Sequence, residues 1–277
     1  MVNETQKNDY QDERDVRHWW RTSIIDMEPG KIHFRGHPIE ELIGNISFSQ
    51  MVWLMTKGQL PTQAEAELLE CALVAGVDHG PQAPSIATAR MAATCGLGLN
   101  NVMASAVNML GDVHGGAGEQ CAQLYFDIAD KMEGGLALDK AVCVGLDEWR
   151  EQHGKIVSGF GHRFHKPLDP RAPRLMTVVR VAAQEGVVSG AFADIAESIQ
   201  QELIRQRAGR GIAMNIDGAT AVIFCELGFP APLSRGLFCL SRSVGILAHA
   251  WEQMQQGGRN KGPMPKRFLP EYEPPEK

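Results

Sequence analysis

The sequence predicts a mostly α-helical fold, and two observations support this prediction. In segment after segment, apolar residues recur every three or four positions, the spacing that gathers them on one face of a helix. Phe192, Ile195, Ile199 and Leu203 form one such stripe. Alternation of apolar and polar residues, which is typical of half-buried strands, is rare. The chain is therefore expected to bury its apolar residues between helices.

The first element is the only one with strand character. Residues 24–34 surround Pro29-Gly30, a pair that predicts the turn of a β-hairpin. Helical spacing or strong helix formers then predict helices at 64–75, 85–110, 117–132, 136–152, 170–185 and 192–206.

The last predicted helix, 233–254, is the most apolar run of the chain. It contains Arg235, Arg242, His249 and Glu252, so we expect a helix buried inside protein and no membrane span. A buried Arg242 needs an anion, either a carboxylate of the protein or one of a substrate. The tail that follows, rich in Pro, Gly and charge, predicts either a segment wrapped over a surface or a neighbouring subunit, or solvated disorder.

Composition limits the class of protein. A chain of 277 residues with 44% hydrophobic content can bury a sizeable core in one or two domains, and its net charge of -6 argues against nucleic acid as a partner. Six scattered cysteines and a polar N-terminal stretch without an apolar core favour a reducing compartment, and we expect a cytoplasmic protein. Cations concentrate between Gly161 and Arg174, which suits a polyanionic small molecule.

One segment, residues 159–171, combines two glycines, two histidines and several cations before a predicted helix. Gly159 and Gly161 would let the backbone approach a ligand closely. The pair Asp169-Pro170 predicts a helix start, which places Arg171 in the first turn, where a guanidinium can meet a carboxylate bidentately. A basic surface loop that caps a helix is the alternative for this segment alone.

Two further segments contain candidate catalytic groups. His114 precedes a Gly pair and a predicted helix, whose positive N-terminal end would favour a neutral imidazole able to donate to an oxyanion. Asp217 lies in the apolar segment 212–223, where burial would raise its basicity. A lone aspartate of this kind is more often a helix cap than a base.

Together, these segments resemble the citrate synthase superfamily. The matching motifs, in chain order, are 34–42, 57–61, 114–117 (His-Gly-Gly-Ala), 159–172, 215–217 (Asn-Ile-Asp) and 242–253. The resemblance implies a two-domain helical fold with a shortened large domain, 1–116 and 225–277, and a small inserted domain, 117–224. It also implies a site in the cleft between the domains, and a homodimer or higher homo-oligomer.

The resemblance assigns roles to residues of this chain. Asp217 would exchange a proton with the methyl carbon of acetyl-CoA, and His114 would stabilise the enol through the thioester oxygen. His162 would bind or protonate the oxygen that is a ketone in oxaloacetate, and in the cleavage direction would act as base on the hydroxyl group. The further implied residues are, for substrate carboxylates, Arg171, Arg242 and His79, and, for coenzyme A, Lys166 with Gly159 and Gly161.

Three departures favour a lyase within the family. The gap between Pro61 and Asp78 is shorter than in full-length citrate synthases, and Asp217 is followed by Gly218 and Ala219 where aromatic residues are usual. The motifs at 78–81 and 215–218 resemble instead the citryl-CoA lyase module of ATP-citrate lyase and stand-alone citryl-CoA lyases. The third departure replaces the family's C-terminal Arg-Pro by Gly-Pro, for which Lys261, Lys266 or Arg267 could substitute.

The implied reaction is cleavage of citryl-CoA to acetyl-CoA and oxaloacetate, with the coenzyme A thioester as substrate and no bound cofactor. A citrate or 2-methylcitrate synthase, a relative acting on another 2-oxo acid, and a non-catalytic sensor of coenzyme A or dicarboxylates remain alternatives. No metal site is expected from the sequence, because no histidines show the close spacing of ligands on one element; His162 and His165 are the nearest pair.

Overall fold

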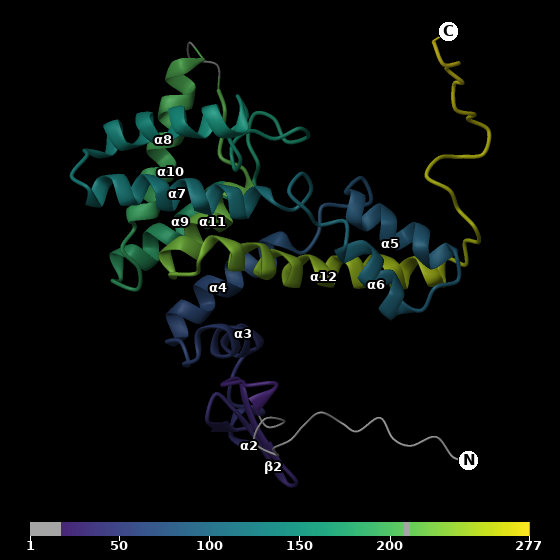
Figure 1. Ribbon diagram of the computed structural model, residues 1–277, viewed down its shortest axis with the longest axis horizontal. Coiled ribbons are helices and arrows are strands. Elements are labelled where there is room, and N and C mark those ends of the chain that lie inside the picture. Colours follow the sequence, from purple (N-terminus) through teal and green to yellow (C-terminus); the bar gives the residue numbers. More distant parts are fainter. Residues whose placement is uncertain (1–17, 208–210, 277) are drawn as a thin grey trace, which may run out of the picture. The chain divides into compact units, whose positions relative to one another are not determined.

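The computed structural model describes residues 18–207 and 211–276, and this part of the chain is mostly helical (Figure 1). The predicted fold class is therefore confirmed. The chain divides into two compact units, Met1–Ala66 and Glu67–Lys277. The predicted division into a discontinuous large domain and a small domain at 117–224 stays a prediction.

The first unit contains the predicted hairpin. Strands β1 (Ile25–Glu28) and β2 (Lys31–Phe34) pair in antiparallel register, and Gly30, with φ 82°, makes the turn that the sequence predicts. A two-residue strand β3 (His37–Pro38) extends the sheet in the order β1-β2-β3. The helices α2 (Ile39–Leu42) and α3 (Phe48–Lys57) follow, and a capping box formed by Ser47 and Gln50 begins α3.

The second unit is built from helices. They are α4 (Gln63–Gly76), which begins in the first unit, α5 (Pro84–Thr94), α6 (Leu99–Val107), α7 (Ala117–Glu133), α8 (Leu138–His153), α9 (Arg171–Gln184), α10 (Ala191–Gln206), α11 (Ile216–Glu226) and α12 (Ala231–Gln255). The predictions for α4, α7, α8, α9, α10 and α12 agree closely with these bounds.

One predicted helix was wrong. The segment 85–110 is two helices, α5 and α6, because the chain turns between them. Gly96 adopts φ 85° at this turn, a left-handed conformation that few residues other than glycine adopt easily. Apolar residues on both sides of the turn hid it in the sequence, since each half keeps helical spacing on its own.

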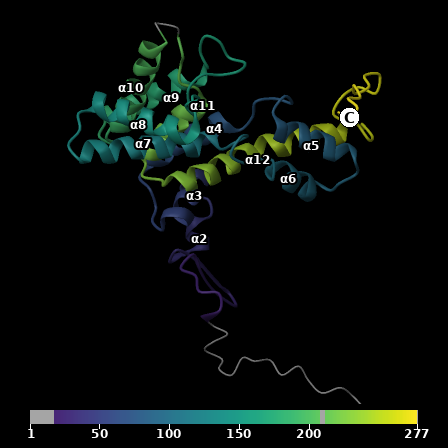
Figure 2. The same ribbon diagram turned by 45° about the horizontal axis from the view of Figure 1, so that its top comes forward.

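Helix α12 is the long central element of the second unit. Helices α5 and α6 pack against its C-terminal half through Ile86, Val102, Ile246 and Ala250, all fully buried (Figures 1 and 2). The other half contacts α7, which in turn packs on α8 and α11. The segment 233–254 thus packs against other helices, as expected, and the segment 85–110 packs on it as two helices.

None of the helices in the described part of the chain combines the length and apolar content that a bilayer crossing requires. After α12, the described tail is exposed and has no helix or strand. Its first residues lie against the end of α5, because Asn260 and Lys261 donate their backbone N–H groups to the carbonyl and hydroxyl oxygens of Thr94 at 2.8 and 3.0 Å.

Candidate active site

Two short segments join the loop before α9 to the start of α11. The backbone N–H of Gly161 donates to the carbonyl of Ala213 at 2.7 Å, and the N–H of Asn215 donates to the carbonyl of Gly159 at 2.9 Å. The side-chain amide of Asn215 adds a third bond, to the carbonyl of Gly161 at 2.6 Å. These bonds place the predicted histidine loop beside the predicted catalytic aspartate.

Gly159 is required at this junction by a close approach. It adopts φ 87°, and a Cβ atom added to it would lie 2.4 Å from Sγ of Cys121 and 2.9 Å from Cα of Gly218. Such distances leave no space for a side chain. The sequence predicts that this glycine makes room for a ligand, whereas in the structure the room is taken by Cys121 of α7 and by Gly218 in the first turn of α11.

Asp217 lies in that first turn but does not cap the helix. The cap is Asn215, whose Oδ1 accepts from the N–H groups of Asp217 and Gly218 at 2.9 and 3.2 Å. Among the described residues none donates a hydrogen bond to the Asp217 carboxylate. Burial raises its pKa, although the charges of Arg171 and Arg242 oppose the rise. The arrangement leaves a free carboxyl group with raised basicity.

His162 is held in one protonation state by its own loop. Its Nδ1 accepts the backbone N–H groups of Phe164 and His165 at 3.0 and 2.9 Å, so in the neutral ring the proton is on Nε2. Burial lowers the pKa of His162, with Asp169 opposing the shift. The free Nε2–H is therefore a hydrogen-bond donor, which fits an oxygen-binding role better than the role of base.

His114 has the complementary tautomer. Its Nε2 accepts the backbone N–H of Ser85 at 3.2 Å and lies 3.0 Å from the Ser85 hydroxyl, which leaves Nδ1 to carry the proton. Burial and the nearby charge of Arg242 lower the pKa of His114. The sequence predicts a neutral imidazole over the N-terminus of the following helix; the contact in the structure is with the first turn of α5 instead.

His79, from the loop between α4 and α5, completes a group of three histidines. Its Nε2 lies 3.1 Å from Nε2 of His165, and the ring centroids of His79 and His162 are 5.2 Å apart. Burial, together with the charge of Arg171, lowers the pKa of His79. The predicted pocket histidine is thus beside His162, and His165 joins them.

Arg171 lies in the first turn of α9, as predicted, although the helix begins at Arg171 and not at Pro170, and its guanidinium is already paired. Nε and Nη2 donate to the two oxygens of Asp169 at 3.0 and 2.8 Å. Asp169 is 1% exposed and also accepts the backbone N–H of Ile216. Burial alone would raise the pKa of Asp169, but the bonds from Arg171 and Ile216 lower it to about 2. This carboxylate links α9 to α11 and fixes the direction of Arg171.

Arg242 is buried without a carboxylate partner. It is 6% exposed, its Nε donates to the carbonyl of Gly76 at 3.1 Å, and its guanidinium stacks on the ring of Phe238. No carboxylate oxygen of the described residues lies within ion-pair distance of it; Asp78 and Asp217 act only from further away. Of the two partners considered from the sequence, the structure offers no protein carboxylate, so the guanidinium is available to an anion.

Of the predicted coenzyme A contacts, Gly159 is buried, Gly161 is half-buried and Lys166 is exposed. Lys166 and Arg163 are exposed on the loop that begins at Gly161, where they can meet phosphate groups without the cost of burying a charge.

Sequence reasoning missed three parts of the site. Asp169 was interpreted only as a helix cap, Ser85 was not considered, and His165 was weighed only as a spacing to His162. The signal for His165 was present, because residues three apart in a tight loop can face one another. The contacts of Ser85 and Asp169 join segments far apart in the sequence, which no local pattern reveals.

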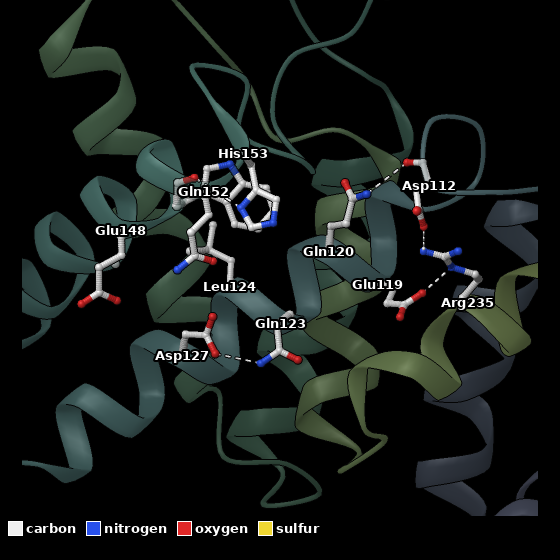
Figure 3. Close-up of a pocket in the computed structure, with 12 residues that line it drawn as sticks. Asp112, Glu119, Gln120, Gln123, Leu124, Asp127, Glu148, Gln152, His153 and Arg235 are labelled. Carbon is white, nitrogen blue, oxygen red and sulfur yellow. Dashed lines mark hydrogen bonds and ion pairs between the residues drawn. The ribbon is translucent and has the colours of Figure 1, made fainter.

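A separate cavity of about 570 Å³ lies between α7, α8 and the start of α12 (Figure 3). It contains none of the predicted site residues. Its carboxylates include Asp112 and Glu119, both ion-paired with Arg235, and Asp127, which accepts from Gln123 (Figure 3). The charged groups of this lining are mostly carboxylates, which would repel a polyanion, so the histidine cluster remains the candidate site.

Comparison with known proteins supports one family. The family model "Citrate synthase, C-terminal domain" matches residues 16–76 and 62–263. A citrate synthase of Saccharolobus solfataricus is 28% identical over 227 residues, which are 82% of this chain and 58% of that protein. The chain thus spans little more than half the length of this curated relative.

Two solved structures resemble the chain over nearly its whole length. The citryl-CoA lyase from Hydrogenobacter thermophilus superposes with a TM-score of 0.80 and 33% identity, covering 94% of this chain and 97% of that one. The ATP citrate lyase from Methanothrix soehngenii, in complex with citrate and coenzyme A, has a TM-score of 0.77 and 20% identity; the match covers 99% of this chain and 47% of that one. The second likeness concerns the fold alone.

Proposed function

Because the chain belongs to the citrate synthase family, we propose that it is a citryl-CoA lyase, which cleaves citryl-CoA to acetyl-CoA and oxaloacetate. The observation that supports this most directly is the likeness to a citryl-CoA lyase, with 33% identity and a TM-score of 0.80 over 94% of this chain. The departures at Gly218, Ala219 and 78–81 point the same way.

The site contains the groups that such a cleavage needs. Breaking the C–C bond sends its electron pair to the acetyl-CoA fragment, whose enolate oxygen requires a hydrogen-bond donor. His114 can supply this donor from Nδ1, because its Nε2 is engaged by Ser85. Asp217, with its raised pKa, can hold a proton and deliver it to the terminal carbon of the enolate.

The other fragment becomes a ketone as its hydroxyl proton leaves. The Nε2–H of His162 can bind this oxygen, and its tautomer makes it a donor there rather than the base suggested by the resemblance. In the pair formed by His79 and His165, the Nε2–H of one ring donates to Nε2 of the other, so the donating ring, when neutral, has an unprotonated Nδ1 that can accept a proton. We assign the acceptance of the hydroxyl proton to this pair.

Cationic side chains near these atoms match the negative charges of the proposed substrate. The unpaired, buried guanidinium of Arg242 and the oriented guanidinium of Arg171 suit the carboxylates of a dicarboxylate. Exposed Lys166 suits a phosphate of coenzyme A, which enters as the thioester substrate. The chemistry described needs no cofactor bound to the protein.

The proposal also includes the assembly state and the cellular compartment. Four large apolar side chains exposed on one face of α12, Leu240, Val244, Leu247 and Trp251, support a homodimer or a higher homo-oligomer. All six cysteines are free thiols, which suits the reducing cytoplasm.

The proposal is tested by adding citryl-CoA to the purified protein and measuring products by mass spectrometry. Acetyl-CoA with oxaloacetate, in equal amounts and without citrate, is expected. Citrate with free coenzyme A would show instead that the site hydrolyses the thioester, the outcome of the citrate synthase alternative that the curated relatives favour. No turnover of citryl-CoA, together with binding of coenzyme A, would favour the sensor.

A further inference from the structure

We propose that His249 is a positioning residue, which holds the loop of His79 in place through Asp78. Arg90 fixes the tautomer of His249 that this role requires. The residues come from the loop before α5, from α5 and from α12, so their grouping is a product of the fold. The role rests on the proposed function, in which His79 and its histidine partner accept the hydroxyl proton.

Asp78 shapes the loop in which His79 lies. Its Oδ2 accepts the backbone N–H of Gly80 at 3.0 Å, a bond to the second residue along the chain that fixes the backbone on both sides of His79. Burial alone would raise the pKa of Asp78, but the bonds from His249 and from the backbone lower it. Asp78 is therefore an ionised acceptor at neutral pH, and its place decides where the His79 ring lies.

His249 connects this carboxylate to α12. Its Nε2 lies 3.3 Å from Oδ2 of Asp78, and its Nδ1 lies 3.0 Å from Nη1 of Arg90. Because a guanidinium only donates hydrogen bonds, Nδ1 must be the acceptor, and the proton of the neutral ring is on Nε2. The ring therefore accepts from Arg90 on one side and donates to Asp78 on the other.

Arg90 is anchored independently of His249. Its Nη1 also donates to Glu252, and its Nη2 donates to Oε1 of Gln256 at 2.8 Å. Glu252 lies in the last turn of α12 and Gln256 directly follows that helix. The guanidinium would therefore keep its direction in a variant of His249, so a substitution there changes mainly the contact with Asp78.

The backbone of α12 approaches the same loop one turn earlier. Gly245 is four positions before His249, on the same face of the helix, and a Cβ atom on it would lie 2.1 Å from the carbonyl oxygen of Val77. The helix thus contacts the loop at Val77 and at Asp78, the two residues before His79. Loss of the second contact should let the ring move, and a displacement of a catalytic group by about 1 Å can cost about 10²-fold in rate.

Two substitutions of His249 separate its two bonds. His249→Gln places an amide nitrogen near the position of Nε2, where it can still donate to Asp78. His249→Asn is one carbon shorter; its amide reaches only the position of Nδ1, where it can accept from Arg90. For citryl-CoA cleavage, kcat should fall by up to about 100-fold in His249→Asn, with little change in KM, and His249→Gln should keep most of the wild-type kcat.

The control is His153→Asn, which changes an exposed histidine on α8 and should leave kcat unchanged. Circular dichroism of each variant checks that it is folded, because a merely structural role would lower stability and leave kcat of the folded protein intact. Equal kcat in His249→Asn and His249→Gln would overturn the proposal.

A double variant tests whether His249 acts through Asp78. Asp78→Ala should lower kcat by itself, and His249→Asn added to it should cost nothing more, because residues that act through one contact are not additive. Losses that multiply in the double variant would overturn the proposal.

Nuclear magnetic resonance reads the arrangement without any turnover. Long-range proton–nitrogen spectra of the nitrogen-15-labelled full chain distinguish protonated from unprotonated ring nitrogens. Signals that disappear in His249→Gln and in His79→Gln identify the two rings. The proton of His249 is expected on Nε2, and a proton on Nδ1 would overturn the proposal.

The His79 signals should shift in His249→Asn and stay close to those of the wild type in His249→Gln and His153→Asn. Unmoved His79 signals in His249→Asn would refute the positioning role. A wild type that shows the expected tautomer and these shifts, but does not cleave citryl-CoA, would refute the proposed function and keep the contact between α12 and the loop.

Discussion

Single hydrogen bonds decide which nitrogen of each histidine faces the reaction. His114 uses Nε2 to accept from Ser85, whereas His162 uses Nδ1 to accept from its own loop. Both rings are therefore neutral donors, and burial keeps them neutral by lowering their pKa values. The resemblance suggests a base at His162, but these bonds make the residue a donor, since a base would need the lone pair that the backbone already uses.

Asp217→Asn should remove cleavage and leave the protein at least as stable. The amide keeps the shape and loses the transferable proton, a change that costs about 10²–10⁴ in rate. Burial raises the pKa of Asp217, so the folded protein binds this proton more tightly than the unfolded chain, and the ionised form lowers stability above the folded-state pKa. Steady-state rates and urea unfolding at neutral pH measure the two effects.

The matched control is Asp139→Asn, because Asp139 is exposed and is likewise the second residue of its helix, α8. It should keep full activity and lose about 0.3–1 kcal/mol, the contribution of an acidic residue near a helix N-terminus. Unchanged turnover in Asp217→Asn would refute its assigned role.

Arg242→Met should weaken dicarboxylate binding without unfolding the protein. A buried guanidinium with no carboxylate nearby is costly, and an unbranched apolar side chain relieves that cost. Losing one side of a buried charge pair with the substrate costs about 2–5 kcal/mol in binding. Calorimetric titration with oxaloacetate and a thermal melt separate the two roles, and Arg235→Met, which removes ion pairs with Asp112 and Glu119, is the control. A collapse of the melting temperature in Arg242→Met with unchanged oxaloacetate affinity would assign Arg242 to structure alone.

Between elements, one carboxylate joins α9 to α11. Asp169 has a pKa of about 2 in the folded protein against an ordinary value of 3.8. A lowered pKa contributes stability that is present above the ordinary value and is lost as the pH falls through about 2. At about 1.4 kcal/mol per pKa unit, the contribution is about 2.5 kcal/mol.

Asp169→Asn should therefore lower the free energy of unfolding by about 2.5 kcal/mol at neutral pH, and the difference from the wild type should narrow as the pH falls below 3.8. Urea unfolding of both proteins across the acid range measures this difference. A constant difference at every pH would mean that the shape of the side chain, and not its charge, stabilises the junction.

Helix α12 approaches the loop of His79 so closely that only glycine fits. A Cβ atom on Gly245 would lie 2.1 Å from the carbonyl oxygen of Val77. Gly245→Ala must displace that loop, and we expect a loss of about 1–3 kcal/mol, typical of overpacking, together with lower activity. Gly236 is the matched control on the same helix, because its nearest neighbour would be 3.8 Å away.

Gly236→Ala should instead gain about 0.5–1 kcal/mol, the ordinary advantage of alanine in a helix, at unchanged activity. Thermal unfolding and turnover of the two variants give the comparison. If the two alanine variants had the same stability and turnover, the loop that contains Val77 could move without loss of stability.

The sequence predicted helices and strands better than the contacts between distant segments. Apolar spacing was enough for α7, α8 and α10, and the turn at Gly30 was recognised from its neighbours. The break at Gly96 was missed because helical spacing continues on both sides of it. The tautomer of His114 depends on Ser85, which is 29 positions away. The ion pair of Asp169 with Arg171 was not predicted, because aspartate at such a position is more often a helix cap. Contacts between distant segments leave no local pattern to detect.

At the scale of the whole molecule, exposed apolar residues on α12 indicate how the chain assembles. Four large apolar residues of α12 are exposed although other faces of this helix are buried: Leu240, Val244, Leu247 and Trp251, at 43, 59, 42 and 53%. Their spacing of four, three and four places them on one face, the arrangement by which one helix packs along another. Such a stripe suits a homodimer in which α12 meets its copy.

We therefore expect the wild type to sediment as a dimer, or as a larger even-numbered assembly, at micromolar concentration. The double variant Val244→Lys, Leu247→Lys should be monomeric, because two like charges per chain would face each other across the shared axis. Ile156→Lys, which changes an apolar residue exposed at 79% away from α12, should assemble like the wild type. A wild type that is monomeric and active would refute the assembly. A dimer that persists in the double variant would move the interface to another face.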